Sequence, residues 1–339
     1  MKRLFSGIQP SGVLHLGNYL GAIQNWVKLT ESFERPIYSI VDLHSLTTVS
    51  RTESLKKMRD RISNNSFELA TTLLACGLDP DKCVLFRQSQ VPYHGHLAWL
   101  LSCRTRLSSL ELMTQYKSKT VIDGFEANCG LFTYPVLMAA DIMLYKANAV
   151  PVGDDQKQHL ELTRRIINEV NKAAKEKLFP IPETIYTTSS KVTSLGDANS
   201  KMSKSSSNPK DCIFLSDSPD IIRSKLKKAK TDSEKGIWYD QDNRPEISNL
   251  LRVFSAITGE SIEDICKQYE SSTNVQFKEA LSDVLVEHFV PIQERMKVFY
   301  DNKPLVYSIL ENGAKEANNI AYETIQEVNL KLGLGEIIR

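Results

Sequence analysis

The chain has 339 residues, of which 41% are hydrophobic and 24% are charged, and its formal net charge is +1. This is the composition of an ordinary globular protein, and the length is sufficient for two domains. The near-neutral charge excludes a protein that coats nucleic acid through charge alone, and the short apolar runs exclude a membrane-spanning protein.

The first half of the sequence alternates between predicted strands and predicted helices. We expect strands at residues 4–8, 36–43, 83–86 and 149–152. We expect helices at residues 14–29, at 53–76, from about 97 onward, and up to about 170. This alternation predicts an α/β fold with a doubly wound, Rossmann-like parallel sheet, which binds its ligand at the carboxyl ends of the strands.

Beyond about residue 216 the predicted elements are helices only, at residues 247–257, 262–269, 277–299 and 305–332. The change of pattern predicts a catalytic domain at 1–215, a smaller all-α domain at 216–300 and a C-terminal segment at 301–339. The helical part contains a short basic stretch from Arg223 to Lys230. By itself, such a stretch is typical of a solvated helix face.

A first nucleotide-binding signature, His15-Leu16-Gly17-Asn18, follows the first predicted strand and the turn Gln9-Pro10-Ser11-Gly12. A strand, a glycine-containing turn and a helix N-terminus together present backbone N–H groups and a partial positive charge to an anion. Gly17 permits close approach of the backbone to a ligand, and His15 and Asn18 can donate to phosphate oxygens. Alone, the signature fits a tight structural turn equally well.

A pattern that fits a flat ligand follows at Thr133-Tyr134-Pro135, where we expect a helix that opens with Pro135 as its first residue. Tyr134, Met138 and Asp141 then fall on one helix face. An aromatic ring, a thioether and a carboxylate suit an apolar ring with one N–H to donate, such as indole. Taken alone, the same stripe is also typical of core packing with a polar end.

The second nucleotide-binding signature is Lys201-Met202-Ser203-Lys204-Ser205, in a segment rich in Gly, Ser and Asn. Two ammonium groups on such a loop can close over a triphosphate and neutralise departing pyrophosphate. The sequence contains neither a Walker A motif nor G-x-G-x-x-G, which excludes the commonest rival nucleotide sites. The two signatures together predict an ATP site built from both ends of the catalytic domain.

We predict no metal-binding side chains. The six cysteines show no C-x-x-C spacing, so we expect reduced, mostly buried thiols of an intracellular protein. The pair His94 and His96 has neither the spacing nor the acidic or cysteine partners of a metal site.

In order and spacing, the two signatures resemble those of the class I aminoacyl-tRNA synthetases. The segments Phe5 to Ala22 and Leu131 to Tyr145 narrow the resemblance to the tryptophan-specific branch, along almost the whole chain. The resemblance implies a ligase that activates L-tryptophan with ATP and Mg²⁺ and transfers it to tRNA(Trp). It also implies a homodimer joined through an insertion at about residues 90–130, an anticodon-binding role for 216–300, and a C-terminal helix packed on the catalytic domain.

The resemblance also implies roles for individual residues. The ATP site comprises Gln9, Pro10, Ser11, His15, Leu16, Gly17, Asn18, Gly153, Asp154, Asp155, Val192, Lys201, Met202, Ser203, Lys204 and Ser205. The catalytic side chains are His15, Asn18, Lys119, Lys201 and Lys204. The tryptophan pocket comprises Phe5, His44, Tyr134, Met138, Asp141 and Gln156. The sequence departs from the family pattern at Asp154, where Glu is common, and at Ser206-Ser207, where Asp-Pro is common.

Three rival interpretations stay open at this point. A tyrosyl-tRNA synthetase must satisfy a phenol oxygen as donor and acceptor, which the pair Met138 and Asp141 does not favour. A small-molecule nucleotidyltransferase does not need the helical part, and a non-catalytic RNA-binding relative is expected to have lost the loop lysines. The source stays open: the segment Val41-Asp42-Leu43-His44-Ser45 slightly favours the mitochondrial branch, whereas the absence of a transit peptide before Phe5 favours the bacterial one. We expect a cytoplasmic enzyme of the bacterial type, or a mitochondrial matrix enzyme if the source is eukaryotic.

Overall fold

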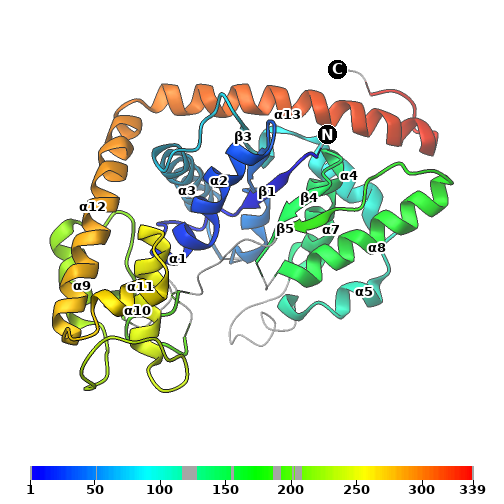
Figure 1. The fold of residues 1–339 in the computed structure, drawn as a ribbon. Helices are drawn as coiled ribbons and strands as arrows, with labels where there is room; N and C mark the ends of the chain where they lie inside the picture. Colours follow the sequence, from blue (N-terminus) through cyan, green and yellow to red (C-terminus); the bar gives the residue numbers. More distant parts are fainter. Residues whose placement is uncertain are drawn as a thin grey trace.

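The computed structural model describes residues 2–50, 52–116, 128–153, 156–185, 192–200, 202 and 208–337. Figure 1 shows a sheet with helices on both of its faces and a group of helices (α9, α10 and α11) beside it. The long helix α12 packs with this group, and α13 continues from it across the sheet. The predicted α/β fold with additional helices is therefore confirmed.

The sheet is parallel and doubly wound. Its strands are β1 (Phe5–Ile8), β2 (Ile37–Ile40), β3 (Val84–Arg87), β4 (Ala149–Pro151) and β5 (Glu183–Ile185). One parallel sheet has the order β1-β2-β3, a second has the order β4-β5, and a parallel bridge between Leu4 and Ala149 links β4 to β1. In the combined order 5-4-1-2-3, strands β2 and β3 follow β1 on one side, and β4 and β5 lie on its other side. The strand order therefore switches between β1 and β4, and the crevice at the carboxyl ends of these two strands is the expected ligand site.

Helices connect the strands and cover the sheet. They are α1 (Leu16–Asn18), the π-helical turn η1 (Tyr19–Ile23), α2 (Gln24–Ser32), the 3₁₀ turns η2 (Leu43–Thr48) and η3 (Gln88–Gln90), α3 (Leu55–Ala75), α4 (Tyr93–Ser102), α5 (Leu107–Glu111), α7 (Cys129–Leu144) and α8 (Lys157–Ala174). The predicted strand at 36–43 ends at Ile40, because Leu43 already belongs to the η2 turn. The prediction that the helix near 97 begins there was wrong, since α4 begins at Tyr93.

The largest error of the sequence analysis concerns the start of α7. We expected Pro135 as the first helical residue, but α7 begins at Cys129, and Asn128 caps it by accepting a hydrogen bond from the Leu131 N–H. Pro135 lies inside the helix, where it lacks the N–H that would bond to the carbonyl of the residue four positions earlier. The strand β5 was not predicted at all, because its three residues contain no apolar run and none of them is buried.

Residues 208–337 are almost entirely helical. The elements are the 3₁₀ turn η5 (Pro209–Asp211), α9 (Pro219–Lys228), α10 (Pro245–Thr258), α11 (Ile262–Gln268), α12 (Asn274–Asp301) and α13 (Lys303–Leu332). Their starts follow local capping chemistry: Ser218 caps α9, Ser261 caps α11, and Thr273 forms a capping box with Gln276 at α12. The buried side chains of α9 to α12 belong to the same hydrophobic core as those of α2 and α3.

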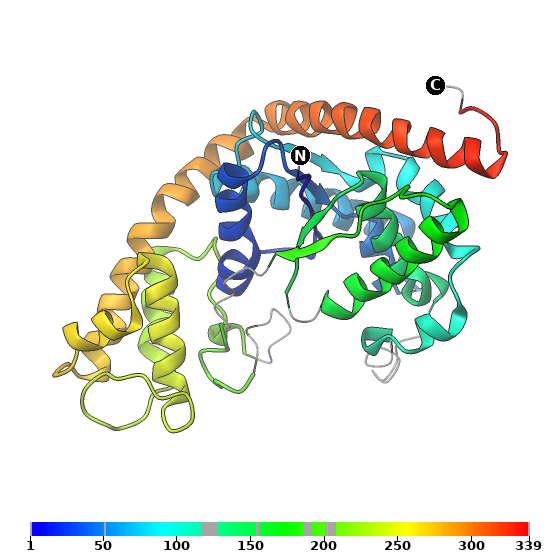
Figure 2. The same cartoon turned by 45° about the vertical axis from the view of Figure 1, so that its right-hand side comes forward.

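Helix α13 returns across the molecule and packs on the sheet, as Figures 1 and 2 show. At Gly313 the helix passes so close to β3 that a Cβ atom would meet the Leu85 carbonyl oxygen at 2.0 Å. Only glycine permits this approach. The next buried positions of the helix, Ala314, Ala317 and Ala321, join the second hydrophobic core, which also contains residues of α4, α7 and α8.

Two further sequence predictions can be compared with the described residues. None of the described helices is long and apolar enough to cross a membrane. The cysteines are all free thiols, but only Cys83 and Cys212 are buried, so the prediction that most of them are buried was wrong. The exposed pair, Cys103 and Cys129, lies at helix ends on the surface.

Candidate active site

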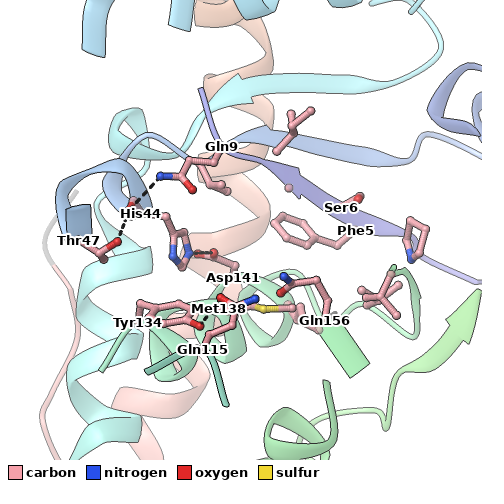
Figure 3. Close-up of a pocket in the computed structure, with 17 residues that line it drawn as sticks. Phe5, Ser6, Gln9, His44, Thr47, Gln115, Tyr134, Met138, Asp141 and Gln156 are labelled. Atoms are coloured by element: carbon pink, nitrogen blue, oxygen red, sulfur yellow. Dashed lines mark hydrogen bonds and ion pairs between the residues drawn. The ribbon is translucent and has the colours of Figure 1, made fainter. Parts of the chain in front are cut away.

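A cavity of about 290 Å³ lies at the carboxyl ends of β1 and β4, where the strand order reverses. Figure 3 shows that side chains from β1, from η2 and from α7 converge on it. The residues predicted to form the amino-acid pocket all line this cavity: Phe5, His44, Tyr134, Met138, Asp141 and Gln156.

Asp141 is the polar centre of the cavity wall, and it is almost fully buried. His44 Nε2 lies 2.9 Å from Asp141 Oδ2. Gln88 Nε2 donates to Oδ1 over 2.7 Å, and His94 Nδ1 lies 2.6 Å from the same oxygen. A buried carboxylate needs such donors, because burial without them is costly.

These contacts determine the charge of Asp141. Burial raises the pKa of its carboxyl group, but the hydrogen bonds from His44 and His94 outweigh burial and lower that pKa to about 2. Burial also raises the pKa of Tyr145, whose hydroxyl lies 2.7 Å from His94 Nε2, well above its ordinary value. The cavity therefore presents an ionised acceptor, and the phenol behind it keeps its hydrogen.

We expect Asp141 to stabilise the fold at neutral pH and to lose this contribution in acid. Its folded-state pKa of about 2 lies below the ordinary carboxyl value of about 3.9, so the unfolded chain takes up the proton first. The contribution is therefore complete above about pH 5 and declines as the pH falls toward the folded-state value. The measurement is the unfolding free energy of the wild type minus that of Asp141→Asn across this range, and a difference that grows in acid would contradict the prediction.

Aromatic and apolar side chains form the remaining walls of the cavity. The ring of Phe5 stacks on Tyr145 with centroids 5.4 Å apart, and the rings of His44 and Tyr134 meet edge to face at 6.1 Å. The Tyr134 hydroxyl donates to Gln115 Oε1 over 2.8 Å and lies 2.5 Å from His159 Nε2. These contacts fix the rings, and a fixed slot of this kind suits a flat ligand.

Sequence reasoning missed the polar lining residues Ser6, Thr47 and Gln115, and it missed Gln88 and His94, which contact Asp141. Gln88 comes directly after β3, and the carboxyl end of a buried parallel strand is a signal that could have identified it. His94 was considered only as a metal ligand, although a histidine that is buried in an apolar helix needs a hydrogen-bond partner inside the protein. Gln115 offered no such signal.

The first nucleotide signature forms the start of α1. His15 caps the helix: its Nδ1 accepts from the Asn18 N–H at 3.3 Å, and Asn18 Oδ1 accepts from the His15 N–H at 3.2 Å. A residue distant in sequence also fixes this turn: the Leu16 N–H donates to the Ile213 carbonyl over 2.8 Å. The predicted strand–turn–helix arrangement is present, with the Gly17 backbone close to the His15 ring.

The second signature meets the first at one described residue. Met202 is buried, and its N–H donates to the Val192 carbonyl over 3.4 Å. A Cβ atom on Gly17 would lie 3.8 Å from Met202 Cβ, so the two segments are neighbours although 184 residues separate them in the chain. Segments from residues 15–18 and around residue 202 therefore lie side by side at this edge of the sheet.

Other predicted nucleotide-binding residues occupy the same region. Gln9 lines the cavity and donates from Nε2 to the His44 carbonyl over 3.4 Å. Pro10 and Ser11 follow it, and Gly153 is exposed just beyond β4. The predicted residues that lie outside the described part of the chain are Lys119, Asp154, Asp155, Lys201, Ser203, Lys204 and Ser205.

Comparison with known proteins shows the family of the chain. Residues 1–290 match the family described as tRNA synthetases class I (W and Y). The tryptophan–tRNA ligase of Rickettsia conorii is 43% identical over 333 residues, which cover 98% of this chain and 98% of that protein. The crystal structure of tryptophanyl-tRNA synthetase from Mycoplasma pneumoniae superposes with a TM-score of 0.86 at 34% identity, covering 99% of this chain and 98% of that one. The enzyme from Campylobacter jejuni, in complex with ADP and tryptophan, gives 0.80 at 32% identity, covering 98% and 99%.

Proposed function

The chain belongs to the tRNA synthetases class I (W and Y), and we propose a role for each part of its site in the ligation of tryptophan to tRNA. It is an ATP-dependent aminoacyl-tRNA ligase that activates L-tryptophan and transfers it to tRNA(Trp). The observation that carries the assignment of roles is the buried, ionised Asp141 in an aromatic slot, next to the edge where the two nucleotide signatures meet.

Asp141 is proposed to accept the indole N–H. It is the charged acceptor of the cavity, while Phe5 and Met138 offer apolar contact to a ring. Gln156 lines the cavity from the start of α8, where its amide can bind the ammonium and carboxylate end of the amino acid. Because a carboxylate cannot donate, a ring that only accepts hydrogen bonds gains nothing from this site.

ATP is proposed to lie along the edge formed by the two signatures. At the start of α1 the Leu16 and Asn18 N–H groups are paired within the protein, so the Gly17 N–H and the side-chain amide N–H of Asn18 are proposed to donate to phosphate oxygens. Lys119, Lys201 and Lys204 are proposed to neutralise the phosphates. Mg²⁺ is proposed to enter as the ATP complex, bound to the triphosphate oxygens, where it supplies charge neutralisation.

The reaction then has two steps. The tryptophan carboxylate attacks the α-phosphorus and pyrophosphate leaves; afterwards a terminal ribose hydroxyl of the tRNA takes the acyl group from the adenylate. The attacking carboxylate is already ionised, so the protein needs no nucleophile of its own, and catalysis consists of positioning and electrostatic stabilisation.

The helices at 216–300 are proposed to bind the anticodon end of the tRNA. The cytoplasm is proposed as the compartment in which the reaction takes place.

The proposed function is tested by ATP–pyrophosphate exchange with each of the twenty amino acids in turn. We expect tryptophan to support exchange and tyrosine to support little, because Asp141 can accept from a phenol O–H but cannot donate to the phenol oxygen, which is also an acceptor. Exchange driven by another amino acid would overturn the assignment of this cavity.

A homodimer is proposed to form through α4 and α5. Trp99 is 69% exposed, Leu107 67% and Leu112 61%, a concentration of large apolar side chains that favours a partner surface. We expect Trp99→Asp to convert the dimer to monomers in sedimentation at micromolar concentration. Exchange activity should fall with it, because α4 packs on α7, which carries Asp141.

The matched control for this dimer test is Val298→Asp, which changes an equally exposed apolar residue on α12 and should leave the dimer intact. A wild-type chain that sediments as a monomer with full activity would contradict the proposal.

A further inference from the structure

His94 lies behind the amino-acid cavity, where it contacts the lining residue Asp141. Its side chain is 0% exposed, its Nδ1 is 2.6 Å from Asp141 Oδ1, and its Nε2 is 2.7 Å from the Tyr145 hydroxyl. Its ring also stacks on Phe86 with centroids 5.9 Å apart. The described lining of the cavity does not include His94, and its hydrogen bond to a lining residue is the one to Asp141.

The contacts define which atom of each polar group carries a hydrogen. An ionised Asp141 can only accept, so His94 donates from Nδ1, and in the neutral ring this leaves Nε2 to accept from the Tyr145 hydroxyl. Gln88 is oriented in the same way: its Oε1 accepts from the Leu43 N–H over 3.1 Å, which leaves Nε2 to donate to Asp141. The hydrogen bonds therefore form one consistent network.

This network leaves a limited capacity on Asp141. A carboxylate offers about four lone-pair positions. On Oδ1 the donors are Gln88 and His94, and on Oδ2 the donor is His44. With these donors from the described part of the chain, one acceptor position is left on Oδ2, the oxygen that faces His44 in Figure 3.

We propose that His94, held by Tyr145, is a positioning residue that fixes the Asp141 carboxylate so that its remaining lone pair accepts a ring N–H. The inference rests on the proposed function of Asp141. Without His94, the carboxylate loses one of the two donors that hold Oδ1 and can rotate away from the geometry that a ring N–H requires. Preference for a ring that donates a hydrogen bond should then decline, although the shape of the slot is unchanged.

The test compares tryptophan with β-(benzothiophen-3-yl)alanine, in which sulfur replaces the ring N–H. The measured quantity is the ratio of their kcat/KM values in ATP–pyrophosphate exchange. We expect His94→Leu to lower this ratio about tenfold, the effect of weakening one hydrogen bond to a charged group. A residue with a purely structural role would lower both kcat/KM values and leave their ratio unchanged.

Two conservative variants distinguish the atoms of His94. The amide of His94→Asn can place its N–H where Nδ1 stands, so this variant should keep most of the preference. The amide of His94→Gln reaches the position of Nε2 instead, so this variant should lose the preference. His96→Asn is the matched control, because His96 lies on the same helix, is half-buried and is not part of the network.

Asp141→Ala, which removes the acceptor altogether, separates the two possible failures. An unchanged ratio in Asp141→Ala would overturn the proposed function of Asp141 itself. A ratio that collapses in Asp141→Ala but stays unchanged in His94→Leu would overturn only the role of His94. If His94→Leu does not fold, His94→Gln and Tyr145→Phe carry the test, and an unchanged ratio in both would overturn the inference.

Discussion

Replacing Lys204 with alanine is expected to slow adenylate formation by about 10²–10³, while the affinity for tryptophan changes little. The expected loss is that of one charge contact made as pyrophosphate departs, since such a contact acts on the transition state and not on the bound amino acid. The rate is measured in single turnovers with excess enzyme, and tryptophan affinity is measured separately in the absence of ATP.

The structure supports this assignment through Met202, two positions before Lys204 in the sequence. Met202 is buried next to Gly17, so this described residue of the signature lies at the start of α1, the expected phosphate site. Lys210→Ala is the control, because Lys210 is an exposed lysine on the nearby turn η5 and lies outside the signature. A loss of tryptophan affinity as large as the loss of rate would rule out the proposed role of Lys204.

Much of the fold was predictable because it depends on local patterns. The strands β1 to β4 are short apolar runs flanked by turns, and the order of strands and helices alone indicated a doubly wound sheet. Helix starts were less predictable where a long-range contact decides them. Asn128 begins α7 and also donates from its side chain to the Thr47 carbonyl, a contact between segments far apart in the sequence.

The site was predictable to the extent that its residues share an element or a signature. Tyr134, Met138 and Asp141 lie on one helix face, and their spacing in the sequence predicted that the three side chains are neighbours. Gln88 and His94 contact Asp141 from other elements, and no spacing in the sequence relates them to it. Long-range packing brings these donors to the carboxylate, and sequence patterns do not encode such packing.

Asp141→Ala is expected to weaken both tryptophan recognition and the fold. The substitution removes the acceptor of His44, His94 and Gln88 and leaves their N–H groups buried and unpaired. Breaking a buried charged contact of this kind typically costs about 3–5 kcal/mol of unfolding free energy. The stability loss is measured by denaturant unfolding, with Met138→Ala as a control that removes bulk from the same helix face and leaves the hydrogen bonds intact.

Recognition is separated from stability by comparing two ligands on the same folded variant. The loss of a charged acceptor for the indole N–H should cost tryptophan about 1.5–3 kcal/mol of binding free energy, roughly a tenfold to hundredfold loss of affinity. An analogue without a ring N–H makes no such hydrogen bond and should lose much less, although it occupies the same slot beside Phe5 and Met138. Equal losses for both ligands would show that Asp141 only holds the cavity together, and the specificity for tryptophan would then have to come from the shape of the aromatic slot.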